Sequence, residues 1–221
     1  VAVISAVAEW LDLNMTNHEA ANLAYVLERE DIGLKGGKQD HYAAVFGGFN
    51  LMRFRSDGVD VNCVRVKDDT VNELQYRSVL CYTGTTRESA NIIDSQVKSF
   101  KKGSNEDALD HTKRIAEDMA SALEKGDVQS TGELLDEGWR NKKMFSDKIS
   151  NPLIDKLYDT AKASGAIGGK VSGAGGGGFM YFICDYDKKY TVSKELAKCG
   201  ARIIDFMFEP KGVRSWRYNN G

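Results

Sequence analysis

Hydrophobic residues recur at helical spacing from the first residue of the chain. Val1, Ile4, Val7, Ala8 and Leu11 all fall on one face of a helix. This predicted helix has no capping residue and no preceding turn, and the sequence does not start with methionine. We therefore expect the chain to be a piece of a longer protein.

A second helix and a hairpin follow this first helix. Thr16 and Glu19 have the spacing of a capping box, which predicts a helix start. Two strand-like runs, 49–55 and 59–67, are joined by Asp57-Gly58. Such a dipeptide favours the positive φ angles of a tight hairpin turn, so the two runs are expected to pair.

The rest of the chain alternates strands with helices. The polar segment 68–72 marks a predicted boundary between one domain of residues 1–72 and another of residues 73–221. Strands are expected at 74–82, 167–172, 179–184 and 202–208, and helices at 87–100, 106–125, 128–147, 152–164 and 188–198. With the extra helices set aside, the order is βαββαβ, which is the ferredoxin-like arrangement of an α+β fold.

Composition narrows the classes of partner. The 221 residues carry a formal net charge of −2, and 42% of them are hydrophobic. This charge predicts no attraction to nucleic acid or to an anionic membrane, and no hydrophobic run approaches the ~20 residues of a membrane span. The four cysteines are widely spaced without a C-x-x-C pair, which favours free thiols in a reducing cytoplasm.

The strongest chemical signal is a run of seven glycines within residues 168–178. Glycine weakens regular structure, but it lets a backbone approach an anion closely and point its N–H groups at that anion. The expected strands on both sides disfavour a flexible linker, and a tight hairpin alone would need only two glycines. We therefore predict a phosphate-binding loop formed by Gly173, Ala174, Gly175, Gly176, Gly177 and Gly178.

Two common nucleotide-binding patterns do not fit this loop. No G-K-[ST] follows it, so it is not a P-loop. It also leads into another expected strand, whereas the loop of a dinucleotide-binding oxidoreductase leads into a helix.

The segment 170–179 resembles the third motif of the GHMP kinases, a family that includes galactokinase and mevalonate kinase. Within this family the chain looks most similar to the D-glycero-D-manno-heptose 7-phosphate kinases, and the resemblance covers essentially the whole sequence. The further stretches that carry it are 36–40, 42–50, 82–87, Trp139 and Lys142-Lys143.

This resemblance implies a fold and an activity. The expected fold is part of an N-terminal ribosomal-protein-S5-like lobe, followed by a ferredoxin-like domain with inserted helices. The implied activity is ATP- and Mg²⁺-dependent phosphorylation of a sugar hydroxyl, with heptose 7-phosphate as the substrate and the 1,7-bisphosphate as the product. A second glycine- and serine-rich motif of the family, which supplies the main phosphate cradle, is absent here. The ATP site is therefore expected to be incomplete, and the chain by itself to be inactive.

Two carboxylates are candidates for the chemistry. Asp40 lies in an expected glycine-flanked loop, where a carboxylate could orient and deprotonate an acceptor hydroxyl, although a turn-forming aspartate would look the same. The resemblance implies that Asp40 is this acceptor base. It also implies that Glu28 is the metal ligand, and a solvated charge at a helix end is the alternative.

The substrate-binding candidates begin with Arg87, which follows Thr83 and Gly84 at an expected strand-to-helix turn. Hydroxyls, backbone N–H groups and a guanidinium at a helix start can form an anion site, so Arg87 is the first candidate for the substrate's own phosphate. A surface arginine with a local partner is the alternative. Gly37 and Lys170 complete the candidates; Lys170 could equally be a surface lysine at a strand end, and Lys142-Lys143 is expected to be solvated.

Other functions remain open from the sequence. The same scaffold could phosphorylate galactose, fucose or a mevalonate-type alcohol, or the chain could be a degenerate family member that binds a ligand without turnover. The oligomeric state is not predicted.

Overall fold

The computed structural model describes residues 1–85, 92–96 and 106–218 and divides into two compact units. Unit 1 contains residues 1–64 together with the segment that starts at residue 208, and unit 2 contains residues 65–207. The final segment thus packs with the start of the chain rather than with the sequence just before it. The domain boundary after residue 72 stays a prediction.

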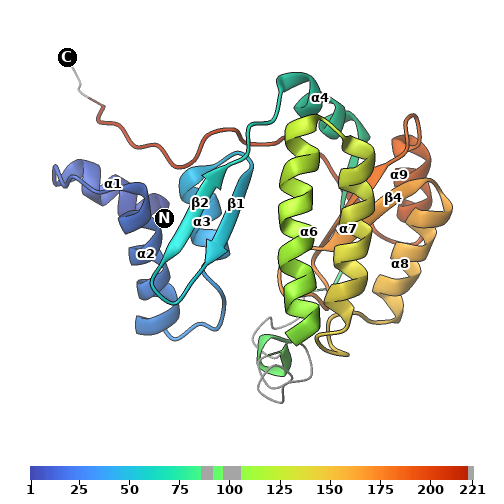
Figure 1. The fold of residues 1–221 in the computed structure, drawn as a ribbon, viewed down its shortest axis with the longest axis horizontal. Helices are drawn as coiled ribbons and strands as arrows, with labels where there is room; N and C mark the ends of the chain where they lie inside the picture. The colour runs from blue at the N-terminus through green and yellow to red at the C-terminus, as the bar shows by residue number, and fades with distance from the viewer. Residues whose placement is uncertain (86–91, 97–105, 219–221) are drawn as a thin grey trace. The chain divides into compact units, whose positions relative to one another are not determined.

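Unit 1 consists of helices and one hairpin (Figure 1). Its elements are α1 (Ala2–Trp10), α2 (Asn17–Tyr25), the π-helix η1 (Val26–Asp31), α3 (Gln39–Phe46), β1 (Asn50–Phe54) and β2 (Val59–Cys63). The predicted capping box is present, because the Thr16 hydroxyl accepts from the N–H of Glu19 while the Glu19 carboxylate accepts from the N–H of Thr16. The predicted hairpin is also confirmed, with Phe54 opposite Val59 and the Arg55 N–H donating to the Gly58 carbonyl at 2.9 Å.

A small core holds unit 1 together. Ala20 and Ala21 of α2 pack against Tyr42 and Val45 of α3. The final segment is tied to the same helix, since the N–H of Val213 donates to the α3 carbonyl of Ala44 at 3.0 Å. This return of the chain, some 170 residues later in the sequence, has no signal in the local hydrophobic pattern.

Unit 2 is built on a four-stranded antiparallel sheet in the order β4-β5-β3-β6. Its elements are α4 (Asp68–Arg77), β3 (Ser78–Tyr82), α6 (Glu106–Lys125), α7 (Val128–Lys143), α8 (Pro152–Ala163), β4 (Ala166–Val171), β5 (Phe179–Cys184), α9 (Lys189–Lys198) and β6 (Arg202–Ile204), and residues 92–96 are also helical. The expected βαββαβ order with inserted helices, and the α+β class, are therefore confirmed.

One segment differs from the prediction. Residues 74–77 were expected to begin a strand, but they complete helix α4. Thr70, Leu74 and Arg77 are buried at helical spacing, and the two aspartates at the start of the helix suit its dipole. The Arg77 guanidinium then donates to the Cys184 carbonyl at 2.8 Å, a tertiary contact that a local sequence pattern does not reveal.

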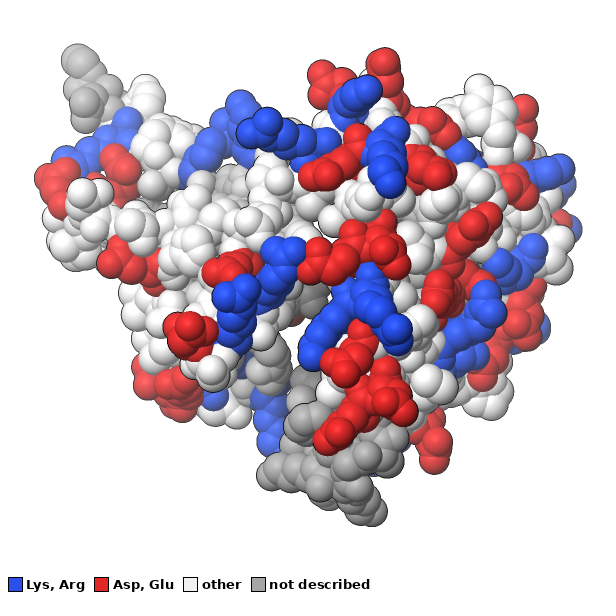
Figure 2. All heavy atoms as spheres, viewed as in Figure 1, with Lys and Arg blue, Asp and Glu red and all other residues white. Residues whose placement is uncertain are grey.

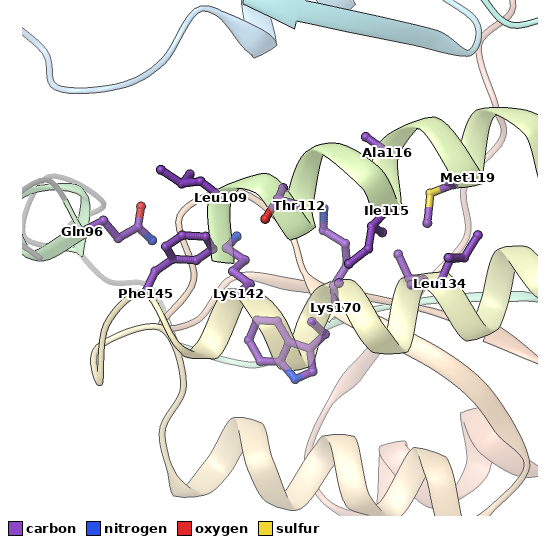
Figure 3. A pocket seen from close by; sticks show the side chains of 13 residues that line it. Gln96, Leu109, Thr112, Ile115, Ala116, Met119, Leu134, Lys142, Phe145 and Lys170 are labelled. Carbon is purple, nitrogen blue, oxygen red and sulfur yellow. The ribbon is translucent and has the colours of Figure 1, made fainter. Parts of the chain in front are cut away.

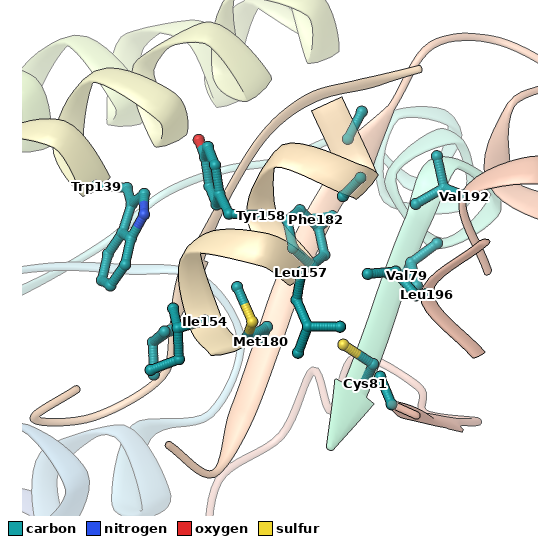
Figure 4. Packing of buried hydrophobic residues seen from close by; sticks show 14 of the residues in the cluster. Val79, Cys81, Trp139, Ile154, Leu157, Tyr158, Met180, Phe182, Val192 and Leu196 are labelled. Atoms are coloured by element: carbon teal, nitrogen blue, oxygen red, sulfur yellow. The ribbon is translucent and has the colours of Figure 1, made fainter. Parts of the chain in front are cut away.

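The core of unit 2 lies between the sheet and its helices (Figure 4). Helices α7 and α8 pack against β4, helix α9 packs against β3 and β6, and α6 packs on α7. The largest fully buried side chains include Trp139 of α7, Leu157 of α8 and Phe182 of β5. Each large side chain buried in this way stabilises the fold by about 1.5–3 kcal/mol.

Charges of both signs are mixed on the face of unit 2 drawn in Figure 2, and no single-sign patch covers it. Among the helices that the structure describes, none has the length and apolar character needed to cross a membrane.

Candidate functional site

The predicted phosphate loop connects β4 to β5 in unit 2. The Ser172 N–H donates to the Phe179 carbonyl at 2.8 Å, which closes the base of the loop. At its tip, the Gly176 N–H donates to the Ile149 carbonyl at 2.8 Å, and the Asn151 side chain donates to the Gly176 carbonyl at 3.2 Å. The loop is therefore held in one conformation by the segment that precedes α8.

The end of strand β3 holds the other side of the loop. The Thr83 N–H donates to the Gly178 carbonyl, and the Gly178 N–H donates to the Thr85 carbonyl, both at 2.8 Å. The Thr83 and Thr85 hydroxyls lie 3.2 Å apart. The structure thus brings Thr83 and Gly84 beside the glycine loop, whereas Arg87 lies outside the described residues.

The need for glycine is clearest at Gly175. Its φ angle is +113°, and a Cβ at this position would lie 2.8 Å from the Ile149 carbonyl oxygen. The backbone can pass this close to residue 149 only without a side chain.

Several N–H groups of the loop are available to a ligand. Those of Gly173, Ala174, Gly175 and Gly177 donate to no acceptor within the part of the chain that the structure describes. Successive N–H groups in a turn in which glycines adopt positive φ angles, as Gly173 and Gly175 do here, form the kind of concave donor surface that binds phosphate oxygens. This arrangement supports the prediction made from the glycine count.

Two lysines adjoin the loop. Lys142 of α7 donates from Nζ to the Gly173 carbonyl, and Lys170 lies on β4 just before the loop. Burial, together with the nearby charge of Lys170, lowers the pKa of Lys142 to about 8. Burial also lowers the pKa of Lys170. Lys142 was expected to be solvated, but in the structure it is partly buried and hydrogen-bonded to the loop.

A cavity of about 590 Å³ opens beside these lysines between α6 and α7 (Figure 3). Lys142 and Lys170 both line it, as do Gln96 and Thr112. The remainder of the lining is apolar: Leu109, Ile115, Ala116, Met119, Leu134, Leu135, Gly138, Trp139 and Phe145. The volume falls in the range of small-molecule sites.

The carboxylate candidates lie in unit 1. Asp40 is exposed in the first turn of helix α3, not in a loop as the sequence suggested. The helix starts before Asp40 because His41, Tyr42 and Val45 supply a buried helical face behind it. Gly37 precedes this helix in open space, with no atom within 4 Å of the position that a Cβ would take.

Glu28 is held by neighbouring side chains. Its Oε2 lies 2.6 Å from Nε2 of the buried His41, and its Oε1 lies 3.5 Å from the Arg29 guanidinium. The hydrogen bond from His41, with a smaller contribution from Arg29, lowers the pKa of Glu28. The carboxylate is therefore ionised and fixed in orientation near neutral pH.

The Glu28 carboxylate fits Mg²⁺ only as one ligand among several. Within the described ranges, no three His, Cys, Asp or Glu side chains come together in a way that could hold a metal ion. Magnesium is commonly bound by one or two carboxylates, with phosphates and water completing its octahedron. The half-exposed Glu28 carboxylate can supply one such ligand.

Sequence reasoning missed two features. Lys142 follows Leu135 and Trp139 at positions i, i+4 and i+7, so helical periodicity alone could have placed it on the buried face of α7. The pairing of His41 with Glu28 joins residues thirteen positions apart, and no spacing rule predicts it.

Models of one family match both parts of the chain. The model described as the GHMP kinases N terminal domain matches residues 1–48, and that described as GHMP kinases C terminal matches residues 119–202. The second match includes the glycine loop, Lys142 and Lys170, and the first includes Glu28 and Asp40.

Individual relatives agree with these matches. A D-glycero-alpha-D-manno-heptose 7-phosphate kinase from Campylobacter jejuni is 43% identical over 98% of this chain, which spans 64% of that protein's length. A crystal structure of a Campylobacter jejuni protein assigned as a sugar kinase has a TM-score of 0.75 at 42% identity, covering 98% of this chain and 62% of the other. A D-glycero-D-manno-heptose 1-phosphate kinase from Bacteroides thetaiotaomicron has a TM-score of 0.72 at 35% identity, covering 98% and 60%.

The glycine-loop geometry, the two matching models and these relatives agree along nearly the whole sequence, and the chain belongs to the GHMP kinases.

Proposed function

We propose that this chain contributes most of an ATP-dependent kinase that transfers the γ-phosphoryl group to a hydroxyl of heptose 7-phosphate, giving the 1,7-bisphosphate. The observation that carries the proposal is the anchored glycine loop, four of whose N–H groups have no acceptor among the described residues. The similarity to a heptose 7-phosphate kinase supports the choice of sugar.

The glycine loop is suited to the phosphates of ATP. Phosphoryl transfer depends almost entirely on positioning and on stabilising negative charge. The N–H groups of Gly173, Ala174, Gly175 and Gly177 can donate to phosphate oxygens without any motion of side chains. Because the loop is tied to Ile149 and Thr85, its donors are already in place before the ligand arrives.

Mg²⁺ is the cofactor that this chemistry calls for, and Glu28 is the residue proposed to hold it. When bound, the ion neutralises charge on the phosphate oxygens. His41 and Arg29 fix the Glu28 carboxylate and keep it ionised, so it can act as a ligand throughout the neutral pH range.

Asp40 is proposed to accept the proton of the attacking hydroxyl. The sugar oxygen forms a bond to the γ-phosphorus, the bond from that phosphorus to the β–γ bridging oxygen breaks, and ADP leaves. The proton of the hydroxyl passes to the Asp40 carboxylate. Exposure at the start of α3 leaves this carboxylate accessible to a substrate.

The substrate proposal rests on the phosphate already carried by the sugar. Arg87, Thr83, Gly84, Gly37 and Lys170 are the residues proposed to bind the sugar phosphate. The two heptose kinase relatives differ in the phosphate position that their names give, so the position phosphorylated here must be measured.

The cytoplasm is the proposed location. All four cysteines are free thiols in the structure, and thiols persist in a reducing compartment.

The test is an assay of ADP release from Mg-ATP with heptose 7-phosphate, galactose, fucose and mevalonate as acceptors. It should use both the 221-residue chain and the product of the complete reading frame. We expect turnover by the complete product with heptose 7-phosphate, at least about 10²-fold above the other acceptors in kcat/KM, because buried polar groups discriminate strongly. The ³¹P spectrum of the product identifies the new ester.

Two outcomes would change the proposal. Preference for an unphosphorylated acceptor would retain a kinase but remove the heptose phosphate. Tight ATP binding without turnover on any acceptor would favour a non-catalytic family member.

A further inference from the structure

Two lysines from different elements face one cavity. Lys142 extends from helix α7 and Lys170 from strand β4, and Figure 3 shows both side chains directed toward helix α6. The charge of Lys170 is close enough to act on Lys142.

Neither ammonium group has a carboxylate partner among the residues that the structure describes. Within the described ranges, no Asp or Glu oxygen lies within 4.0 Å of the Nζ of Lys142 or Lys170, and the recorded partner of Lys142 is the carbonyl of Gly173. Nearby lysines are paired: Lys143 lies 3.6 Å from Asp155, and Lys162 lies 3.7 Å from Asp136. Two like charges thus lie near each other at the edge of the glycine loop, without a counter-ion from residues 1–85, 92–96 or 106–218.

This arrangement is costly for the protein without a ligand. Desolvation disfavours both charged forms, and the pKa values of both lysines are lowered accordingly. An anion placed between the two ammonium groups would offset both the desolvation and the charge repulsion. It would accept hydrogen bonds in place of the lost water, and its negative charge would attract both groups.

The number of charges selects the kind of anion. A phosphate monoester carries about −1.5 to −2 at pH 7, which matches two ammonium groups, whereas a carboxylate carries −1. The cavity of about 590 Å³ is much larger than a phosphate group, so it also has room for an organic part. The side chain of Gln96 donates to the Ala174 carbonyl at 3.3 Å and helps to fix the loop against this cavity.

We propose that Lys142 and Lys170 form a subsite for a terminal phosphate group in the cavity between α6 and α7. The proposal rests on the proposed kinase function for the identity of the ligand, and it adds Lys142 to the binding residues. Two sources of the phosphate are compatible with it: the phosphate already on the sugar, and the terminal phosphate of the nucleotide.

Pyridoxal 5′-phosphate is a suitable probe for binding to the 221-residue chain. Its aldehyde condenses with an unprotonated lysine to an imine and water, and borohydride then fixes the adduct for mapping by mass spectrometry. We expect modification of Lys142 about tenfold or more faster with pyridoxal 5′-phosphate than with pyridoxal, because Lys170 binds the phosphate of the probe. Inorganic phosphate should protect Lys142.

Three variants make this test specific. Lys170→Met should abolish the preference for the phosphorylated probe, while Lys170→Arg, which keeps the charge, should retain it. Lys143→Met is the matched control, because Lys143 is next to Lys142 but pairs with Asp155. Equal modification of Lys142 by both probes, without protection by phosphate, would overturn the subsite.

Kinetics of the complete reading-frame product distinguish the two sources. If the ligand is the sugar's phosphate, Lys142→Met should raise KM for the phosphorylated sugar about tenfold or more and leave KM for ATP within twofold. The reverse pattern assigns the subsite to the nucleotide. Phosphate-dependent modification in a protein that has no kinase activity would support the subsite and remove the proposed function. Unchanged KM values for both substrates would overturn the role of the subsite in turnover.

Discussion

Tyr158 donates its hydroxyl hydrogen to Oδ1 of Asp136, and this buried contact joins helix α8 to helix α7. Arg140 donates to the other carboxylate oxygen, and Lys162 lies 3.7 Å from Oδ1. Because α7 also contributes Lys142 to the candidate site, the Asp136 network helps to fix the helix that positions this lysine.

Removal of the Tyr158 hydroxyl should weaken this connection. Tyr158→Phe leaves the ring in the core beside Trp139 and Phe182 but removes a hydrogen bond to a charged group. We expect a loss of about 1.5–3 kcal/mol in the free energy of unfolding, measured by urea denaturation. Tyr190→Phe, at an exposed position, is the control and should change it little. A loss below about 0.5 kcal/mol for Tyr158→Phe would show that the contact contributes no net stability.

Asp136 should also make the free energy of unfolding depend on pH in the acid range. Burial by itself would raise the pKa of Asp136, but the hydrogen bonds from Tyr158 and Arg140 outweigh this effect, so its pKa is lowered from 3.8. A carboxyl group whose pKa is lower in the folded state stabilises the fold above its unfolded pKa, and this contribution is lost as pH falls through the folded value. The free energy of unfolding should therefore decrease below about pH 4. The Asp136→Asn variant should be less stable at pH 7, and its free energy of unfolding should decrease less steeply as the pH falls below about 4. If it decreased as steeply as that of the wild type, the acid sensitivity would belong to other carboxylates.

Two positions of the glycine loop should differ in how well they tolerate substitution by alanine. Gly175→Ala introduces a Cβ that would lie 2.8 Å from the Ile149 carbonyl oxygen, whereas the same atom at Gly173 meets nothing within 4 Å. Both positions have positive φ angles, so both substitutions carry backbone strain of about 1–3 kcal/mol. Gly175→Ala should add a steric cost and lower the midpoint of thermal unfolding further than Gly173→Ala does. Equal midpoints would mean that residue 149 moves aside without cost.

Lys142 should make stability increase with pH. Its pKa is about 8 in the fold and about 10.4 in an unfolded chain, so between these values the unfolded state binds more protons. The free energy of unfolding of the wild type, relative to Lys142→Met, should rise by on the order of 1–3 kcal/mol from pH 8 to pH 10.5. The comparison with the variant removes the contributions of the tyrosines and cysteines that titrate in the same range. A constant difference across this range would show that the ammonium group is solvated.

Asp40 should matter for turnover and not for folding. Asp40→Asn in the complete reading-frame product should keep ATP affinity and lose on the order of 10²-fold or more in kcat, the scale of an acid–base group. The unfolding transition should not shift, because Asp40 is exposed. Asp57→Asn, an exposed aspartate of the hairpin turn, is the control. A rate within a few-fold of the wild type would remove Asp40 from the mechanism.

Local signals in the sequence determined much of the fold. The capping box at Thr16 and the Asp57-Gly58 turn act through bonds between residues close in sequence, and the structure contains both. The order of strands and helices in unit 2 also followed from periodicity, since each element must bury one face. The glycine loop was found by composition, because few structures other than a backbone site need so many positive φ angles.

Tertiary contacts decided the remaining features. Residues 74–77 complete helix α4, where Leu74 and Arg77 are buried, and Arg77 reaches a carbonyl more than a hundred residues away. Glu28 is fixed by His41 from another helix, and the final segment returns to α3. Lys142 looked like a solvated lysine beside Lys143, and only the packing of α7 on β4 places its ammonium group next to Lys170 and the loop. Burial and charge proximity are properties of the folded arrangement, so a sequence can supply these lysines but not show that they share a cavity.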